Sequence, residues 1–263
     1  MDKTKIDWCD STWNPVTGCL HGCQYCYARG IAKRFGGNHD LDYFLETEEN
    51  PELKEQKLHV LDAPLAKYNL EASVAPYPFY FEPTLYRYKL DEYHKNKRSR
   101  NIFVCSMADL FGEWVPEEWI IEVFEACKKG PQHNYIFLTK NPKRYLDLDI
   151  YGKLPKEDNF WYGQSVTKIG DKYTDFNYVG YNWFLSLEPL LTPLTITDMP
   201  DWVIVGAETG RRKGKVIPKR EWIEDIVNQC KERQIPVFMK SSLADIWGEP
   251  LIQEFPESLK ERM

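Results

Sequence analysis

Short apolar runs recur along the chain, and segments with helical periodicity separate several of them. Most of these runs are continuous and do not alternate with polar residues, which is typical of parallel strands covered on both faces. Residues 119–127 and 222–230 instead carry apolar side chains at helical spacing. The alternation predicts an α/β fold with a parallel sheet and right-handed crossovers. The predicted strands are residues 6–9, 79–81, 102–105, 135–138, 160–162, 183–187, 202–205 and 237–239.

The length of 263 residues suits one large α/β domain. We expect a single domain over residues 1–263, built as a parallel βα barrel related to the TIM type. This barrel is partial or nearly closed and has about six to eight strands. Residues 37–78 form too long a stretch for an ordinary connection, which predicts an insertion. The insertion is either a solvated surface excursion or a lid over the mouth of the barrel.

The composition indicates a protein with a sizeable core and reduced thiols. Hydrophobic residues make up 43% of the chain, and the net charge of −6 gives no global signature of nucleic-acid binding. The chain has 7 cysteines, an odd number, and its first residues lack an apolar secretory region. No apolar run reaches the roughly 18 residues that span a membrane. We therefore expect a cytoplasmic protein that does not enter a membrane.

Three cysteines stand within eight residues, as Cys19, Cys23 and Cys26 in a C-x3-C-x2-C spacing. An aromatic residue, Tyr25, directly precedes the third. Three thiolates on one short loop can bind three irons of a cubane cluster and leave the fourth iron without a protein ligand. An open coordination position usually indicates chemistry, because structural metal sites are normally closed. The loop also contains Gly18 and Gly22, which adopt unusual backbone angles at least cost.

This cysteine motif resembles that of the radical S-adenosylmethionine superfamily. Further stretches resemble a phage-associated branch of that superfamily, and the resemblance covers nearly the whole chain except residues 37–76. It implies a 4Fe–4S cluster on the three cysteines, with S-adenosylmethionine at the open iron. It also implies reductive cleavage to methionine and a 5′-deoxyadenosyl radical, with an external electron donor such as flavodoxin or ferredoxin. The branch stretches are residues 12–15, 106–111, 138–140, 187–191 and 201–210.

A structural zinc site is the alternative for the cysteine loop. Cys9 or His21 could complete a set of four ligands, but zinc ligands usually come as two knuckles separated by a dozen or more residues. The spacing here fits that pattern poorly, which favours a catalytic cluster. We interpret Cys9 as a buried residue of the first strand, and Cys127 and Cys230 as core residues on their helical stripes.

Polar residues directly follow many of the predicted strands. In barrels of this kind the chemistry lies at the carboxyl ends of the strands, so these residues are candidates for the site. Asp109 and Ser165 could equally be buried polar anchors or helix caps. The strand-end set is Glu82, Ser106, Asp109, Thr139, Lys140, Gln164, Ser165, Glu188, Glu208 and Lys240.

We assign expected roles within this set from the groups of S-adenosylmethionine, which presents an ammonium, a carboxylate, a ribose diol and an adenine. The Gly-Gly-Glu-like stretch by which the superfamily often binds the ammonium is absent, and Glu82 occupies a comparable place. The expected catalytic residues are Glu188, Glu208 and Lys240. The expected cofactor-binding residues are Tyr25, Glu82, Ser106, Asp109, Lys140, Gln164, Ser165 and Gly206.

Two basic stretches differ in their expected positions. Residues 95–100 precede a strand and should lie on the side opposite the active face. Residues 211–220 follow Glu208 and should lie at the mouth, where they form either a solvated loop or a site for phosphates. We therefore place a nucleic-acid base or nucleotide first among substrates and a peptide or protein second. The competing class is a non-enzymatic metal or nucleic-acid-binding module.

Overall fold

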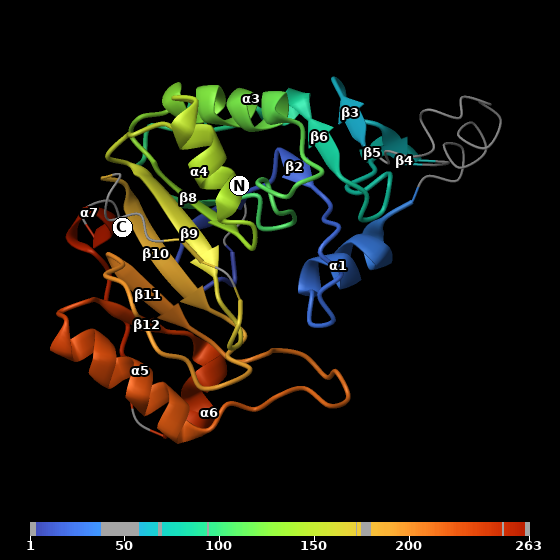
Figure 1. The fold of residues 1–263 in the computed structure, drawn as a ribbon. Coiled ribbons are helices and arrows are strands. Elements are labelled where there is room, and N and C mark those ends of the chain that lie inside the picture. The colour runs from blue at the N-terminus through green and yellow to red at the C-terminus, as the bar shows by residue number, and fades with distance from the viewer. Residues whose placement is uncertain are drawn as a thin grey trace.

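The computed structural model describes residues 4–37, 58–67, 70–93, 95–171, 173–174, 180–248 and 250–260. Its centre is a sheet of parallel strands in the order β1-β7-β8-β9-β10-β11-β12, with 7 strands in all. β1 and β12 lie at the two edges, so the sheet forms a partial parallel barrel, as expected (Figure 1). The strands are β1 Ser11–Trp13, β7 Asn101–Val104, β8 Asn134–Thr139, β9 Phe160–Ser165, β10 Asn182–Leu187, β11 Trp202–Val205 and β12 Val237–Met239.

Helices cover the outer face of this sheet (Figure 1). Both predicted helical stripes are confirmed, and Cys127 and Cys230 are fully buried on α3 and α5. The described helices are α1 Tyr27–Phe35, α3 Glu117–Lys128, α4 Lys143–Ile150, α5 Arg220–Glu232, α6 Ala244–Trp247 and α7 Glu257–Lys260, with short 3₁₀ turns η2 Arg87–Lys89 and η3 Ser241–Leu243. None of these helices is both long and apolar enough to cross a membrane.

Side chains alternate between two cores along each strand, as the two-residue period of a strand requires. On β11, Val203 and Val205 join the large core under the helices, whereas Trp202 and Ile204 join a second cluster inside the barrel. Because both faces of the sheet are buried, the strand sequences are continuous apolar runs.

The floor of the barrel is closed by the segment that follows β12. Leu259 on α7 is fully buried in the inner cluster. Its backbone carbonyl accepts a hydrogen bond of 2.9 Å from the Asn101 side chain at the start of β7. The Trp202 indole donates to the Glu254 carbonyl at 2.9 Å. The inner core is therefore sealed at the amino ends of the strands, and the opposite end is left for the site.

The described part of the predicted insertion is tied to the fold by strand pairing. β3 (His59–Leu61) pairs with β6 (Thr84–Tyr86), which in turn pairs with β2 (Val16–Thr17). β4 (Ala66–Lys67) and β5 (Leu70–Val74) form a separate antiparallel pair. Residues 38–57 lie outside the described part of the chain, so the choice between a surface excursion and a lid stays a prediction.

Two predicted strands are corrected by the structure. Residues 79–81 form turns, with the Tyr80 amide bonded to the Tyr77 carbonyl and Tyr80 at a φ of 52°. Their aromatic character has another cause, because Phe79 stacks on the His59 ring at 3.6 Å and Phe81 packs near Cys26. The first strand begins at Ser11 and not at residue 6. Trp8 and Cys9 are buried, but they reach the inner core from a turn.

Candidate active site at the carboxyl ends of the strands

The cysteine loop connects β2 to α1 at the carboxyl end of the sheet. Cys19, Cys23 and Cys26 are free and partly exposed. Cys26 is the N-cap of α1, and its sulfur accepts a hydrogen bond of 3.4 Å from the Arg29 amide. The amino end of α1 therefore borders the cysteine loop, and a helix amino end favours a negatively charged ligand. Burial raises the pKa of the Cys19 thiol to about 12, so a metal bound there must displace a proton.

The loop is held to two neighbouring segments by its backbone. The Gly18 amide donates to the Met107 carbonyl at 2.9 Å, and the Cys19 amide donates to the Phe81 carbonyl at 3.3 Å. Gly18 has a φ of 87°, and a Cβ at this position would lie 2.2 Å from the Glu82 carbonyl oxygen. Only glycine fits such a close approach without a shift of backbone.

Gly18→Ala should therefore destabilise the fold by more than about 2 kcal/mol, because left-handed strain adds to the clash with backbone. Gly30→Ala is a matched control, since Gly30 lies within α1 and a Cβ there would meet nothing within 4 Å. That control should stabilise the protein by about 0.5–1 kcal/mol. Urea unfolding of both variants measures the difference. Equal stability of the two variants would contradict the tight packing at Gly18.

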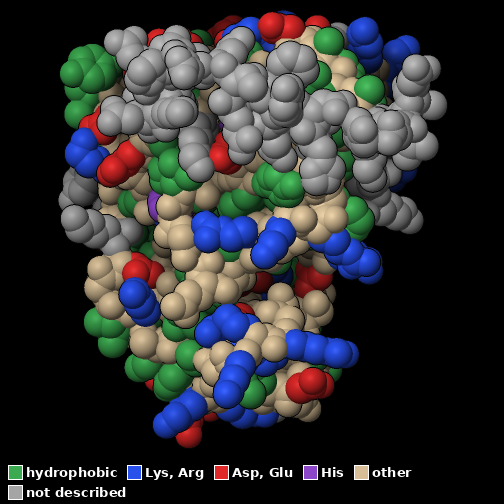
Figure 2. Space-filling model, turned by 90° about the vertical axis from the view of Figure 1, so that its right-hand side faces the viewer, with side chains coloured by type: hydrophobic (Ala, Val, Ile, Leu, Met, Phe, Trp, Pro, Cys, Tyr) green, Lys and Arg blue, Asp and Glu red, His purple; other side chains and the backbone are tan. Residues whose placement is uncertain are grey.

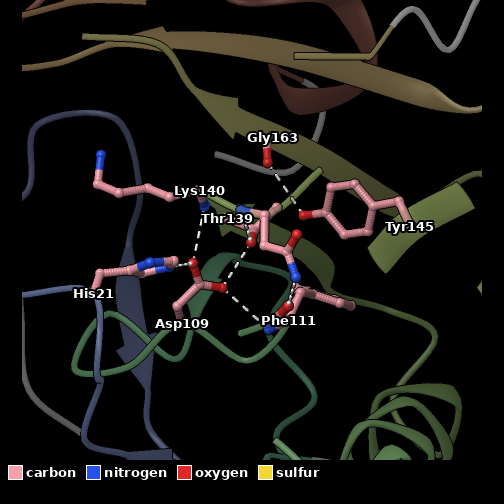
Figure 3. A network of polar contacts seen from close by, with 8 residues as sticks. His21, Asp109, Phe111, Thr139, Lys140, Tyr145 and Gly163 are labelled. Atoms are coloured by element: carbon pink, nitrogen blue, oxygen red, sulfur yellow. Dashed lines mark hydrogen bonds and ion pairs between the residues drawn. The ribbon is translucent and has the colours of Figure 1, made fainter. Parts of the chain in front are cut away.

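Asp109 is the centre of a polar network that joins the cysteine loop to the sheet (Figure 3). Its Oδ2 accepts hydrogen bonds from His21 Nε2 at 2.6 Å and from the Lys140 amide at 2.8 Å. Its Oδ1 accepts from Thr139 Oγ1 at 2.7 Å and from the Phe111 amide at 3.1 Å. The side chain is 7% exposed. Asp109 therefore positions the loop through His21, a contact that spans 88 positions and that no sequence pattern indicated.

Glu188 and Lys240 form an ion pair across the ends of β10 and β12. Both side chains remain partly exposed. Gly206 follows β11 between them, and a Cβ there would lie 3.1 Å from both the Glu188 carboxyl carbon and the Lys240 Cδ. Three residues expected at the site are thus brought together, and the missing side chain at Gly206 makes room for the pair.

Glu208 is bound by a basic residue of the following loop. Arg212 donates two hydrogen bonds to its carboxylate, at 2.6 and 2.7 Å, in a bidentate arrangement. The Arg212 guanidinium lowers the pKa of Glu208, whose side chain is 2% exposed. This pairing fixes Arg212 at the mouth of the barrel and favours a positioning role for Glu208.

Three other residues expected at the site, Gln164, Ser106 and Glu82, are each bound to a different part of the fold. The Gln164 amide is buried and bonded to the Thr174 backbone, so it holds a loop. Ser106 donates to Asn14 Oδ1 at 3.1 Å, and its carbonyl accepts from the Tyr27 hydroxyl at 2.8 Å. Glu82 follows a turn and contacts His59 at 2.8 Å. The expectation that Glu82 ends a strand of the barrel is therefore wrong.

A cavity of about 520 Å³ lies between the cysteine loop and the carboxyl ends of the strands. Within it, the Lys140 ammonium lies 5.5 Å from the centre of the Tyr25 ring. Thr167, Lys168 and Asp171 also line this cavity and were missed, although they closely follow β9. Its lining residues are Gly22, Cys23, Gln24, Tyr25, Lys140, Ser165, Thr167, Lys168, Asp171, Leu191, Arg212 and Val216. A larger cavity of about 720 Å³, between residues 166–171 and α5, is lined by none of the expected site residues.

Three thiolates in C-x3-C-x2-C spacing are a donor set that fits an iron–sulfur cluster. Among the described residues, no three His, Cys, Asp or Glu side chains gather closely enough to hold one metal ion. In a cubane cluster each thiolate binds a different iron, so the three sulfurs need not converge on one point. Thiolate ligands suit iron–sulfur clusters, and they also suit zinc.

Comparison with known proteins identifies the family. No curated protein matches the chain. A solved structure of a mutant spore photoproduct lyase is similar to it, with 9% sequence identity and a TM-score of 0.48, over 90% of this chain and 78% of that one. A family model described as "Protein of unknown function (DUF5131)" matches residues 3–255. The chain therefore belongs to the DUF5131 family.

Proposed function

We propose that the chain is a radical S-adenosylmethionine enzyme that abstracts hydrogen from an unreactive C–H bond of its substrate. The observation that carries this proposal is the place of three free thiols in C-x3-C-x2-C spacing. Their loop borders a cavity at the carboxyl ends of parallel strands. Chemistry in barrels of parallel strands is found at this edge of the sheet.

Cys19, Cys23 and Cys26 would hold a 4Fe–4S cluster at three of its irons, with S-adenosylmethionine at the fourth. When bound, this group supplies reductive cleavage of the sulfonium to methionine and a 5′-deoxyadenosyl radical. The loop itself contributes three thiols at fixed positions. The His21 contact to Asp109 and the Gly18 amide bond to Met107 keep the loop against the sheet.

The ion pair of Glu188 and Lys240 suits the amino-acid end of the cosubstrate. The Glu188 carboxylate can accept from its ammonium, and the Lys240 ammonium can donate to its carboxylate. Ser165, which lines the cavity, is the better placed of the two ribose candidates, because the Gln164 amide already binds the Thr174 backbone. The apolar edge of β11 next to Gly206 is proposed for the adenine.

The proposal includes an external electron donor such as flavodoxin or ferredoxin and a reducing cytoplasmic location. A nucleic-acid base or nucleotide stands first among substrates, since Lys140, Lys168 and Arg212 line the cavity beside the cysteines. A peptide or protein stands second. The phage-associated branch of the superfamily remains part of the proposal on the resemblance of its sequence stretches alone.

Reconstituted and reduced protein should release 5′-deoxyadenosine and methionine in near-equal amounts, slowly, even without its substrate. Liquid chromatography of anaerobic reactions with dithionite measures both products, and Cys23→Ala is the control that should release neither. S-adenosylmethionine should also change the electron paramagnetic resonance spectrum of the reduced cluster. A spectrum unchanged by saturating S-adenosylmethionine, in protein that holds a full cluster, would sink the proposal. Stoichiometric zinc with no uptake of iron would favour a non-enzymatic module instead.

A further inference from the structure

Basic side chains gather on one side of the molecule, although the net charge of the protein is −6. One group lies on α1 and consists of Arg29, Lys33 and Arg34, all exposed. A second group lies on residues 211–219, after β11. Figure 1 places both segments on the same side of the molecule. Figure 2 views that side and shows Lys and Arg side chains in bands above and below a hollowed region.

The cavity beside the cysteine loop is also lined by positively charged side chains. Lys140, Lys168 and Arg212 line it, and Asp171 is the one carboxylate among its lining residues. The Asp171 carboxylate accepts hydrogen bonds of 2.7 and 2.8 Å from Thr167 and is therefore already engaged. Arg212 is paired with Glu208, so Lys140 and Lys168 are the cations that favour an anionic ligand in this cavity. Phosphate oxygens suit these donors.

α1 adds an exposed apolar flank next to its basic residues. Tyr27, Ile31 and Phe35 follow one another at four-residue spacing and are 52%, 37% and 51% exposed. The Tyr27 hydroxyl donates to the Ser106 carbonyl beyond the end of β7, which places this flank at the mouth of the barrel. The Arg34 guanidinium lies 5.2 Å from the centre of the Phe35 ring. Exposed rings beside cations are the surfaces on which unpaired bases stack.

We infer that the mouth of the barrel binds a single-stranded nucleic acid between α1 and residues 211–219. Its phosphates contact the two basic groups, and its bases contact the flank of Tyr27, Ile31 and Phe35. A single strand is favoured over a duplex, because a base must leave its stack to reach a site beside the cysteines. This substrate class rests on the proposed function, whereas the binding itself requires neither cluster nor S-adenosylmethionine.

Fluorescence anisotropy with a labelled single-stranded DNA oligonucleotide tests the basic groups in the full chain. Arg211→Glu, Lys213→Glu and Lys219→Glu together should weaken binding at least about tenfold and lower the slope of log K against log salt by about 2, at roughly 0.7 for each phosphate. The matched control is Lys95→Glu, Lys97→Glu and Arg98→Glu. It changes the net charge equally, at exposed positions that precede β7 and so lie toward the amino ends of the strands. The control should bind as the parent does.

Phe35→Ala tests the apolar flank separately. It should weaken binding about fivefold or more with an unchanged salt slope, because stacking releases no counterions. Tyr151→Ala is its control, since Tyr151 is 72% exposed and lies at the carboxyl end of α4. Circular dichroism of each variant checks that the fold is kept.

The outcomes separate this inference from the proposed function. Undetectable binding at low salt, or an equal loss in both triple variants, would overturn it. Duplex DNA bound as tightly as the single strand would overturn the choice of a single strand. A protein that cleaves S-adenosylmethionine but ignores nucleic acid defeats this inference alone. A protein that binds the single-stranded DNA but assembles no cluster defeats the proposed function.

Discussion

Single replacement of Cys19, Cys23 or Cys26 by alanine should abolish assembly of an iron–sulfur cluster. Each thiolate would be the protein's bond to a different iron, so no neighbour can replace it. Cys127→Ala and Cys230→Ala should leave assembly intact, because both side chains are fully buried under helices. These two should cost about 1–2 kcal/mol of stability through lost packing. Anaerobic reconstitution with iron and sulfide counts, together with urea unfolding, measures both effects.

Cys9→Ala is the decisive control for this series. Cys9 packs with Trp8 and Phe103 in the inner cluster, and burial raises the pKa of its thiol to about 12. We therefore expect Cys9→Ala to take up as much iron as the parent. If it lost its metal as completely as Cys23→Ala, the site would have four protein ligands and the open iron required by the proposal would not exist.

Asp109→Ala should destabilise the protein by about 3–5 kcal/mol, because several donors lose their acceptor at about 1–3 kcal/mol each. The change leaves the Thr139 hydroxyl and the amides of Phe111 and Lys140 without their acceptor. Asp147→Ala is the control, because Asp147 pairs with Lys143 on the exposed surface of α4 and should cost less than about 1 kcal/mol. Urea unfolding compares the two. Similar losses in both would contradict the central place of Asp109.

His21→Ala separates the stability of this network from its effect on the cysteine loop. It removes one contact to Asp109 and leaves the other three hydrogen bonds in place. We expect a smaller loss of stability, about 1–2 kcal/mol, with a clear fall in cluster content. Unchanged cluster content in His21→Ala would show that the loop does not depend on Asp109.

The strands of the barrel were predicted well, because the apolar run that marks each strand lies within the strand itself. β11 and β12 have the predicted bounds, since continuous apolar runs bounded by polar residues leave little choice of strand. The turn at residues 79–81 has the same apolar character, but Phe79 stacks on His59 and Phe81 packs near Cys26, while Tyr80 is 40% exposed. Nothing within a few residues distinguishes such a turn from a strand.

The site was predictable in its location and less so in its contacts. Lys140 and Ser165 line one cavity with Cys23, as expected for polar residues at neighbouring strand ends. The network from His21 to Asp109 and the pairing of Glu208 with Arg212 depend on side-chain directions at the ends of strands and in loops. No periodicity fixes those directions, so the sequence could suggest the participants but not their partners.

The floor of the barrel has a consequence for how the chain matures during synthesis. Trp8 and Leu259 pack in the same inner cluster, although nearly the whole described chain separates them. A ribosome-bound chain that has completed β12 still lacks Phe255 and Leu259, so Trp202 and Phe238 remain uncovered at that stage. Uncovered aromatic surface of this kind attracts aggregation and chaperones. The inner core is therefore completed only after the residues that follow β12 have been synthesised.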